Sequence, residues 1–343
     1  MSRGSLRGEL GSGVGLSLPE YLVSRRCLVE EGIVDFLGCH YDGQVMDIVG
    51  YTAQGGKRLR GILAMLICET LGGTATAALP AAVAVELAQA ASLAHDDIID
   101  GDLARRGRAA LHVRYDLAMA ILVPHLIVPH AVLSTQEYGP EALRVILEGW
   151  ARVTQGQVRD YLPPDLDSGA DLTVRGEGAL GSAEREYWAI VRDKTAALFE
   201  TAAVLGVMAA ADGRHAAPAR EYAAWLGNAF QVADDVADLE QGADRPWAVI
   251  LGPQGARSMG ALRRMFSENG DDVITAGAIS QARQLVSRTV ERCLSCVDLF
   301  PDSPLRELLR AFPAFAVEGI HGEAGNVAPL SHRSVSESPW GGA

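Results

Sequence analysis

The sequence is poor in cysteine, has no long apolar segment at its N-terminus and carries no excess of basic residues. Its five cysteines among 343 residues do not make a disulfide framework, and Cys293 and Cys296 lack the second pair that a zinc site would need. Residues 1–17 fit a flexible leader rather than a signal peptide. The formal net charge of −13 argues against nucleic acid as a partner. We therefore expect a reduced, cytoplasmic protein.

Long β-branched runs are also absent, whereas alanine is abundant and 48% of the residues are hydrophobic. Alanine and leucine are the best helix formers, so we predict an all-α fold with one large core. The single domain would span residues 18–321, followed by a disordered tail over 322–343. The most apolar segment, 117–133, is slightly short for a membrane span and contains two prolines and two histidines. We predict a buried, kinked core helix there and no transmembrane segment.

Hydrophobic periodicity and chain breakers place the remaining elements. The expected helices cover 18–50 with breaks near Gly38 and Gly43, 61–71, 80–100, 141–160, 183–210, 220–240, 258–268, 273–300 and 303–317. The expected loops cover 161–181, 211–219 and 241–258. Asp271 and Asp272 form an acidic pair that a helix N-terminus explains, without a ligand.

The segment 86–106 is an apolar helix that ends in a cluster of carboxylates. Residues four apart share a helix face, so Asp96 and Asp100 point the same way and Asp97 lies beside them. We call these three residues the first Asp cluster. Like charges at this spacing repel each other. A solvated acidic helix end is one explanation of the pattern, and a hard divalent cation bound by carboxylate oxygens is the other.

The same pattern returns in the C-terminal half, and this repetition favours the cation. Within 227–239, Asp234 and Asp238 share a helix face, Asp235 lies beside them, and Gln231 stands one turn upstream. We call the three aspartates the second Asp cluster. Mg²⁺ typically binds one or two carboxylates together with substrate phosphates. Two such helices facing each other therefore predict several Mg²⁺ ions and a diphosphate between them.

Two glycines and two basic residues precede the apolar helix 61–71. Gly55 and Gly56 would let the backbone approach a ligand closely. Lys57 and Arg60 are three residues apart, and both could reach an anion near the helix N-terminus, where backbone amides also point. A grip on a diphosphate and a helix start with solvated bases both fit this pattern.

Further basic residues follow the first Asp cluster and interrupt a later helix. Arg105, Arg106 and Arg108 come directly after the cluster, and guanidinium groups match phosphate oxygens in bidentate geometry. Lys194 lies in an apolar stretch, where a lysine either extends its amine to solvent or contacts a buried anion.

Together these motifs resemble the trans-isoprenyl diphosphate synthase family, also called polyprenyl synthetases. The matching segments are Gly55–Arg60, His95–Asp100, Arg105–Gly107, Lys194–Thr195 and Phe230–Asp238. The resemblance runs over residues 50–240 and, more weakly, through the C-terminal helices. It implies an isoprenoid synthase-type helical bundle around a deep central cavity, usually assembled as a homodimer.

The resemblance also implies a role for each matched residue. The ligands of the Mg²⁺ ions, about three in number, would be Asp96, Asp97, Asp100, Asp234, Asp235 and Asp238. The allylic diphosphate would contact Arg105 and Lys194, in a site lined by Thr195, Phe230 and Gln231. Isopentenyl diphosphate would contact Lys57, Arg60, Gln89 and Arg106. The residues expected to act in catalysis are Asp96, Asp97, Asp100, Arg105, Lys194, Asp234 and Asp235.

The implied reaction is prenyl chain elongation. Cations stabilise the charge on the departing diphosphate, so the allylic C–O bond ionises. The double bond of isopentenyl diphosphate, held in the correct orientation, attacks the allylic cation. Proton loss completes the longer product, and the released diphosphate is a reasonable base. An apolar cavity excludes the water that would quench the cation.

Chain length should depend on the residues below the first Asp cluster. Ala91 and Ser92 stand one helical turn before Asp96, where short-chain family members often carry an aromatic residue. Small side chains leave the tunnel open, which favours a product of geranylgeranyl length (C20) or longer. Bulk from an earlier turn or a neighbouring helix could still close the tunnel, and we predict C20.

The chain departs from the family pattern at three places. Pro124-His125 stands where Gly-Asp is common, which may reshape the cavity wall because proline kinks a helix. The segment from Leu239 to Trp247 is shorter than usual and has no lysine, although Arg245 could supply one cation. Gly61 replaces the usual proline after the basic motif.

Three other functions share part of this pattern. A class I terpene cyclase would use the metals but not the grip on isopentenyl diphosphate, and the chain has that grip. A non-elongating partner subunit would be expected to have a broken Asp cluster, and both clusters are intact; only the shortened segment after Asp238 favours it. A simple metal- or anion-binding helical protein would need neither feature. Elongation is therefore the preferred hypothesis.

Overall fold

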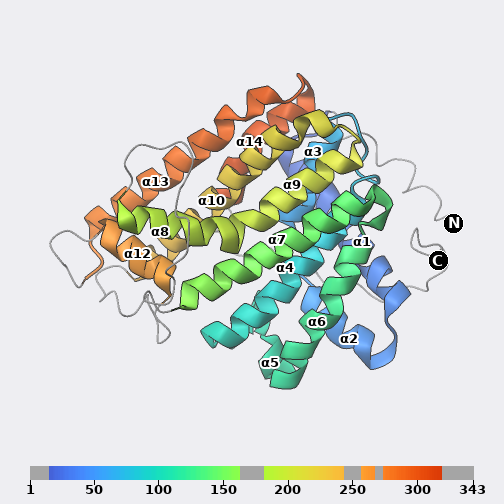
Figure 1. Cartoon of the computed structure of the whole chain (residues 1–343), viewed down its shortest axis with the longest axis horizontal. Helices are drawn as coiled ribbons and strands as arrows, with labels where there is room; N and C mark the ends of the chain where they lie inside the picture. The colour runs from blue at the N-terminus through green and yellow to red at the C-terminus, as the bar shows by residue number, and fades with distance from the viewer. Residues whose placement is uncertain (1–14, 163–180, 243–255, 267–272, 319–343) are drawn as a thin grey trace.

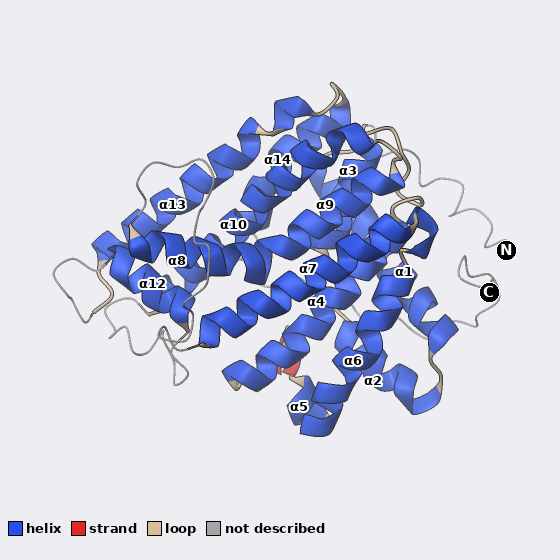
Figure 2. Ribbon diagram, in the orientation of Figure 1, coloured by secondary structure: helices blue, strands red, loops and turns tan. Residues whose placement is uncertain are grey.

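The computed structural model describes residues 15–162, 181–242, 256–266 and 273–318, and nearly all of its regular structure is helical (Figure 2). The helices are α1 (Leu18–His40), α2 (Gly43–Ala53), α3 (Leu59–Thr70), α4 (Leu79–Asp100), α5 (Leu111–Arg114), α6 (Leu117–Leu133), α7 (Pro140–Tyr161), α8 (Ser182–Val191), α9 (Ala197–Ala209), α10 (Ala216–Gln241), α12 (Arg257–Phe266), α13 (Ala276–Ser295) and α14 (Pro304–Glu318). Short 3-10 helices cover Gln136–Tyr138, Gly213–His215 and Val297–Leu299. A π-helical turn, Arg192–Ala196, joins α8 to α9. The all-α prediction is confirmed.

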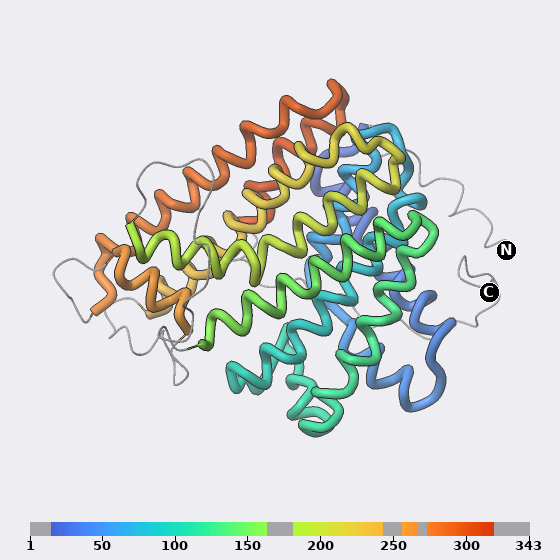
Figure 3. The backbone as a smooth tube through the Cα atoms, in the orientation of Figure 1, coloured from blue at the N-terminus to red at the C-terminus, as the bar shows by residue number. Residues whose placement is uncertain are grey.

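The long helices form one bundle. Helices α4, α7, α9, α10 and α13 run along the same diagonal in Figure 3, and Figure 1 shows α9 near the centre. Helix α9 packs against α3, α7 and α10, while α4 packs against α3 and α6. Helix α3 is buried at nearly every position, as expected for a helix that is apolar on all sides.

Small residues allow the central helices to approach closely. A Cβ atom added at Gly206 of α9 would lie 2.4 Å from the carbonyl oxygen of Ala64 in α3. One added at Gly149 of α7 would lie 2.1 Å from the hydroxyl oxygen of Thr201 in α9. Any larger side chain at these positions would push α9 away from its neighbours, so the glycines set the spacing of the bundle.

A short hairpin follows α4 and returns the chain toward it. Strands β1 (Ala104–Arg105) and β2 (Arg108–Ala109) pair antiparallel. The two residues between them, Arg106 and Gly107, have φ angles of 54° and 72°. Positive φ at both central residues is the geometry of a two-residue type I′ turn. The hairpin therefore places Arg105, Arg106 and Arg108 just after the end of α4.

The helix at 117–133 is confirmed as α6, but the prediction that it is buried is wrong for most of its length. Only 33% of its most apolar 18-residue window is buried. It is the one helix in the described part of the chain that is long and apolar enough to cross a membrane, which by itself is weak evidence of a span. Its exposed large apolar residues are Leu117, Ile121, Leu122, Leu126 and Leu133. An apolar composition predicts burial but does not tell which neighbour provides it.

The other predicted helices agree with the structure to within about one turn. The exception is 183–210, which contains the π turn and is therefore two helices. Several predictions lie outside the described residues: most of the leader 1–17, most of the loops 161–181 and 241–258 including Arg245 and Trp247, the tail 322–343 and the pair Asp271 and Asp272.

Candidate active site

The two Asp clusters lie on either side of shared cations. The first cluster ends α4 and the second lies in the last turns of α10. Burial raises the pKa values of both Asp96 and Asp234, and the charges of Lys194 and Arg105 oppose this rise at both carboxylates. A charge affects two carboxylates in this way only when it lies close to each. The same two cations therefore lie near both clusters.

Within the first cluster, Asp97 is tied to the hairpin. Asp97 is buried, and its Oδ1 atom accepts a hydrogen bond of 2.6 Å from Nε of Arg105. The same guanidinium reaches Asp102 Oδ2 at 2.5 Å. Burial raises the pKa of Asp97, and Arg105 opposes that rise. The hairpin thus holds Arg105 against α4, and its charge also acts on Asp234 of the other cluster.

The other two aspartates of the first cluster are more accessible. Burial raises the pKa of Asp96 to about 6, with Lys194 opposing the rise and the Asp100 carboxylate adding to it. Asp100 is exposed and accepts a hydrogen bond from the hydroxyl group of Tyr161, at the end of α7. Asp96 and Asp100 influence each other directly, as expected for residues four apart on one helix face.

Lys194 contacts a buried anion, which resolves the alternatives left open by its sequence context. Its Nζ atom lies 2.8 Å from Oδ2 of Asp160, a fully buried carboxylate on α7. The other oxygen of Asp160 accepts a hydrogen bond from the Ser258 amide at 2.8 Å. Burial lowers the pKa of Lys194, but Asp160 and the nearby Asp96 more than offset this and raise the pKa above its usual value. Lys194 is therefore cationic at neutral pH.

Sequence patterns did not predict the role of Asp160. A single carboxylate at a helix end has no repeated partner, and only the fold brings it to Lys194. The nearest signal in the sequence is Gly156, four residues earlier, which marks a close backbone approach. A Cβ atom at Gly156 would lie 2.2 Å from the backbone nitrogen of Lys194.

In the second cluster, Asp235 points into the protein rather than beside its neighbours. It is buried and accepts hydrogen bonds from the Tyr187 hydroxyl and, at 3.0 Å, from Nε2 of Gln231. The Oε1 atom of Gln231 accepts in turn from Thr195 Oγ1 at 2.6 Å. Burial raises the pKa of Asp235 to about 7 despite these hydrogen bonds. Tyr187 was not singled out in the sequence, because a lone tyrosine in an apolar helix reads as core.

Asp234 and Asp238 of the second cluster are accessible to solvent. Protein surrounds them on enough sides that burial still raises both pKa values, that of Asp238 to about 6. Side chains that are accessible and also crowded by protein line a cavity. The charges of Arg105, Lys194 and Lys57 oppose the rise at Asp234.

The basic motif before α3 divides into structural and accessible residues. Arg58 is buried and forms an ion pair with Glu30 at 2.7 Å, and Glu86 of α4 lies 3.6 Å from its guanidinium. The amide of Gly61 donates to Oε1 of Glu86 at 2.8 Å. Proline has no amide hydrogen, so the unusual glycine at this position supplies a hydrogen bond that the family's usual residue could not. Arg58 and Glu86 thus join α3 to α4.

Neither Arg60 nor Arg106 forms an ion pair with a carboxylate among the described residues. Arg60 stacks over the ring of Phe199 at 4.3 Å, and its Nε atom has no hydrogen-bond partner among the described residues. Arg106 donates to the backbone carbonyl of Gly55 at 2.5 Å. Burial lowers the pKa values of both arginines to about 10. Partly buried, poorly compensated guanidinium groups fit a site for an anion.

The chain contains two lysines, Lys57 and Lys194, and both lie in this region. Burial lowers the pKa of Lys57, and the carboxylate of Asp234 opposes that effect. Lys57 is therefore near the second Asp cluster, although its position in the sequence groups it with Arg60. The lysines lie on opposite sides of the two clusters, Lys57 beside α3 and Lys194 between α8 and α9.

The remaining predicted residues lie around this centre. The ring of Phe230 is 5.7 Å from that of Phe199, which also carries Arg60. Ser92 donates to the backbone carbonyl of Gln89 at 3.0 Å, and Gln89 itself is partly buried on α4. Ala91 is fully buried in the apolar contact between α4 and α6. Ser92 rather than Ala91 shares the helix face of Asp96.

The donors present fit Mg²⁺ that arrives together with a diphosphate. Both clusters offer carboxylate oxygens, which hard divalent cations prefer. Burial raises the pKa values of Asp96 and Asp238 to about 6 and that of Asp235 to about 7, and a nearby cation would restore their ionised forms. In the described ranges, no three His, Cys, Asp or Glu side chains already form a closed metal site. Mg²⁺ that completes its shell with phosphate oxygens and water needs no such cage.

Known proteins share these features across most of the chain. The sequence model of the family described as Polyprenyl synthetase matches residues 43–245. The hexaprenyl pyrophosphate synthase of Saccharolobus solfataricus is 29% identical over 226 residues, which cover 66% of this chain and 73% of that protein. The geranylgeranyl diphosphate synthase of Methanosarcina mazei is 35% identical over 192 residues, 54% of this chain and 55% of that protein.

Solved structures show the same fold. The polyprenyl synthase of Caulobacter crescentus, solved in complex with calcium and isoprenyl diphosphate, is 25% identical and has a TM-score of 0.67. The similarity covers 88% of this chain and 97% of that protein. The matched residues include both Asp clusters on facing helices and the basic motif before α3. The chain therefore belongs to the polyprenyl synthetase family of trans-isoprenyl diphosphate synthases.

Proposed function

We propose that this protein is a trans-prenyltransferase that condenses isopentenyl diphosphate with an allylic diphosphate. The observation that carries the proposal is the presence of two separate sets of cations. Arg105 and Lys194 lie between the Asp clusters. Arg60 and Arg106 lie to one side and form no ion pair within the described ranges. A cyclase ionises a single diphosphate and needs only the first set, whereas elongation binds two diphosphates.

The Asp clusters would hold the metal ions. Mg²⁺ bound there would neutralise the leaving diphosphate and so favour ionisation of the allylic C–O bond. The carboxylates are suited to this because burial raises the pKa values of Asp96 and Asp238 to about 6, so both groups gain by the approach of positive charge. The calcium and isoprenyl diphosphate bound to the Caulobacter crescentus protein support this assignment.

The chain's own residues would bind and orient the two substrates. Lys194, cationic through Asp160, and Arg105 would donate hydrogen bonds to the allylic diphosphate and stabilise its charge as the bond breaks. Thr195, Gln231 and Phe230 would line this side of the site.

The second substrate would be held by the other cations. Lys57, Arg60 and Arg106, with Gln89 on α4, would bind isopentenyl diphosphate so that its double bond faces the allylic carbon. Lys57 also lies close enough to Asp234 for the two charges to interact, so its charge would act on both substrates. The released diphosphate can accept the proton that the condensation product loses.

We further propose a product of geranylgeranyl length (C20). Ser92 lies one turn below Asp96 on the same helix face and leaves room for a prenyl chain along α4. The named relatives make both geranylgeranyl and hexaprenyl diphosphates, so the family alone does not select a length. The small side chain at position 92 is the feature that favours a product longer than farnesyl.

A second copy of the chain is the proposed cover for α6. This helix exposes five large aliphatic side chains, and a groove of about 390 Å³ between α2 and α6 is lined by Val45, Ile48 and Leu122. Exposed apolar areas of this kind mark protein interfaces. We therefore propose a homodimer. The five cysteines are all free thiols, which fits a reduced cytoplasmic location.

One incubation separates elongation from cyclisation. Purified protein with Mg²⁺ is supplied with labelled isopentenyl diphosphate and, in separate reactions, dimethylallyl, geranyl or farnesyl diphosphate. Products are extracted before and after phosphatase treatment and separated by chromatography. Longer prenyl alcohols that appear only after phosphatase are expected. Hydrocarbons formed without phosphatase and without isopentenyl diphosphate would identify a cyclase, and no product from the folded protein would indicate a missing partner subunit.

A further inference from the structure

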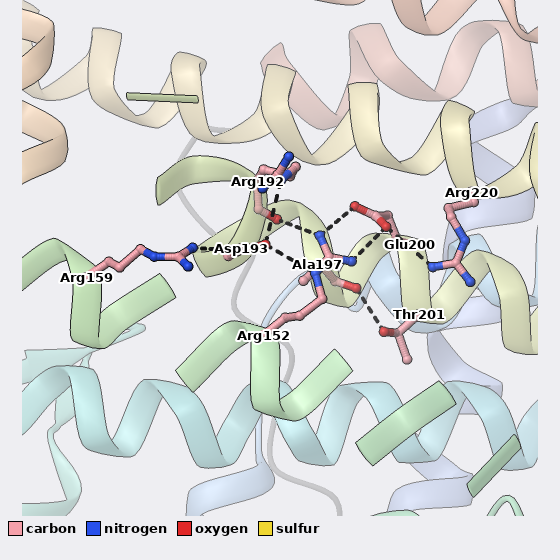
Figure 4. Close-up of polar contacts among 8 residues, drawn as sticks. All are labelled: Arg152, Arg159, Arg192, Asp193, Ala197, Glu200, Thr201 and Arg220. Carbon is pink, nitrogen blue, oxygen red and sulfur yellow. Dashed lines mark hydrogen bonds and ion pairs between the residues drawn. The ribbon is translucent and has the colours of Figure 1, made fainter. Parts of the chain in front are cut away.

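Arg152 of α7 directs its whole guanidinium group at the π turn that carries Lys194. Its Nε atom donates to Oδ1 of Asp193 at 3.2 Å, within the turn. Its Nη1 and Nη2 atoms donate to the two carboxylate oxygens of Glu200 at 2.8 and 3.0 Å, one helical turn beyond it. Nη2 also lies 3.4 Å from the backbone carbonyl oxygen of Arg192, the first residue of the turn. Figure 4 shows Arg152 between these acceptors.

That carbonyl is part of the π turn itself. The amide of Ala197 donates to the Arg192 carbonyl five residues earlier, in place of the usual four. Arg152 therefore contacts the carbonyl of Arg192, which accepts the π hydrogen bond, the carboxylate of Asp193 within the turn, and the carboxylate of Glu200 after it. A single planar group thus spans both ends of a local departure from α-helix geometry.

Asp193 is held from a second side. Its Oδ2 atom lies 2.7 Å from Nη1 of Arg159, about two turns further along α7, and only 8% of its side chain is exposed. Arg192 lies 3.7 Å from the other oxygen. Glu200 is similarly enclosed, with Arg220 of α10 at 3.6 Å (Figure 4). A buried carboxylate with two or more guanidinium partners has one preferred position.

Glycines press the neighbouring helices against the same turn. A Cβ atom at Gly156 of α7 would lie 2.2 Å from the Lys194 nitrogen, and one at Gly227 of α10 would lie 2.5 Å from Cα of Ala196. The backbone of the turn is therefore enclosed by α7 and α10. Within this enclosure Lys194, like Asp193, contacts α7, through Asp160, and Thr195 contacts α10 through Gln231.

We propose that Arg152 and Asp193 are positioning residues that hold the π turn in register and thereby place Lys194 and Thr195 at the allylic diphosphate. The proposal rests on the function proposed above. It assigns a purpose to ion pairs that touch no substrate. An ordinary α-helix over the same residues would rotate Lys194 away from Asp160 by about one residue step, roughly 100°. The ion pairs of Arg152 and Asp193 prevent this rotation.

The sharpest variant is Arg152→Lys, because it keeps the positive charge but loses the fork that reaches three acceptors at once. We expect the KM for the allylic diphosphate to rise about tenfold while the KM for isopentenyl diphosphate changes by less than about twofold. Asp193→Asn, which keeps the shape and removes the charge, should give the same split. Asp193→Glu should recover part of the affinity.

The control is Arg144→Lys, on the same helix, where Arg144 pairs with exposed Glu141 and Glu148. It should leave both KM values unchanged. Melting temperatures, and calorimetric binding of inorganic diphosphate with Mg²⁺, show whether each variant is folded and whether the effect is on binding. Equal changes in both KM values, or none in a folded Arg152→Lys variant, would overturn the proposal. Failure of the proposed function would appear differently, as a wild-type protein that does not elongate.

Discussion

The two Asp clusters have the same sequence pattern but different surroundings. In the first cluster, Asp97 is paired with Arg105 at 2.6 Å, and Lys194 acts on Asp96. In the second cluster, Asp235 is satisfied by neutral donors, the hydroxyl of Tyr187 and the amide of Gln231. The first cluster thus has a guanidinium paired with Asp97, whereas the buried aspartate of the second cluster is held by neutral groups and cations act on its neighbour Asp234 through space.

This difference divides the work of the site. The first cluster already has its cations, so it can bind a diphosphate with little change in charge. Burial raises carboxylate pKa values in both clusters, to about 6 at Asp96 and Asp238, and most at Asp235, to about 7. The second cluster would therefore bind protons most readily in the free protein and exchange them for metal when the substrate brings it. We call the first cluster, which already has its cations, the prepared half of the site, and the second cluster, which exchanges protons for metal, the responsive half.

The largest expected effect comes from removing the prepared half. The double substitution Asp96→Ala and Asp97→Ala should lower turnover by a factor of about 10³ or more, because both metal ligation and the Arg105 partner are lost. Turnover is measured with labelled isopentenyl diphosphate, and circular dichroism checks the fold. The matched control is Asp271→Asn with Asp272→Asn, an acidic pair outside both clusters. Unchanged turnover in the first variant would contradict the assigned role.

A smaller effect is expected at Lys57, which tests whether the two substrates have separate grips. Lys57→Ala should raise the KM for isopentenyl diphosphate by about 10- to 100-fold, since one charge-assisted contact is lost. The KM for the allylic substrate should rise less. Steady-state kinetics with each substrate varied in turn give both values. Equal increases would mean that Lys57 serves the second cluster, where Asp234 already interacts with it.

The responsive half should show itself in the pH dependence of stability. The pKa of Asp235 is about 7 in the folded protein, above the ordinary value for an aspartate, so the folded state binds the extra proton. Stability of the metal-free protein therefore falls as pH rises from about 4 through about 7. Asp235→Asn removes this contribution. Denaturant unfolding should show that the free energy of unfolding of the variant, relative to that of wild type, increases by on the order of 1–2 kcal/mol from pH 5 to pH 7.5. A difference that is constant with pH would refute this.

The smallest effect concerns product length rather than rate. Ser92→Phe should shorten the main product by about one or two isoprene units, because the ring would lie below Asp96 on its own helix face. Ala91→Phe should shorten it less and cost more stability, since Ala91 is fully buried against α6. Chromatography of the dephosphorylated products compares the two variants. Identical products from both would show that the tunnel ends elsewhere.

The sequence predicts much of the site because helical spacing is a local property. The clusters, the basic motif and Lys194 could be recognised from repeats and residue types alone. The π turn at Arg192–Ala196 could not, since α9, which follows it, is buried at nearly every position and has no one-sided apolar pattern whose phase would reveal an extra residue. Asp160 and Tyr187 were missed for a related reason. Each is a single residue whose partner, Lys194 or Asp235, is brought to it only by the fold.

One wrong prediction and one residue that the sequence left unassigned show the limit of composition as a guide. Helix α6 is apolar throughout, yet most of it is exposed, because composition does not identify the neighbour that covers a helix. Arg58 stands in the middle of the basic motif, yet it is buried with Glu30 and Glu86 and joins helices instead of facing a ligand. The residue type at a motif position therefore predicts the charge of the side chain but not the direction in which it points.

The central claim is that the two clusters form one site that only a diphosphate with Mg²⁺ completes. Titration calorimetry of the wild-type protein with a thiolodiphosphate analogue of the allylic substrate, which resists ionisation, tests it most directly. We expect weak binding of Mg²⁺ alone, weak binding of the analogue in the presence of a chelator, and tight binding when both are present, with protons released at pH 6.5. Equal affinity for the analogue with and without Mg²⁺, or tight binding of Mg²⁺ alone, would contradict the account.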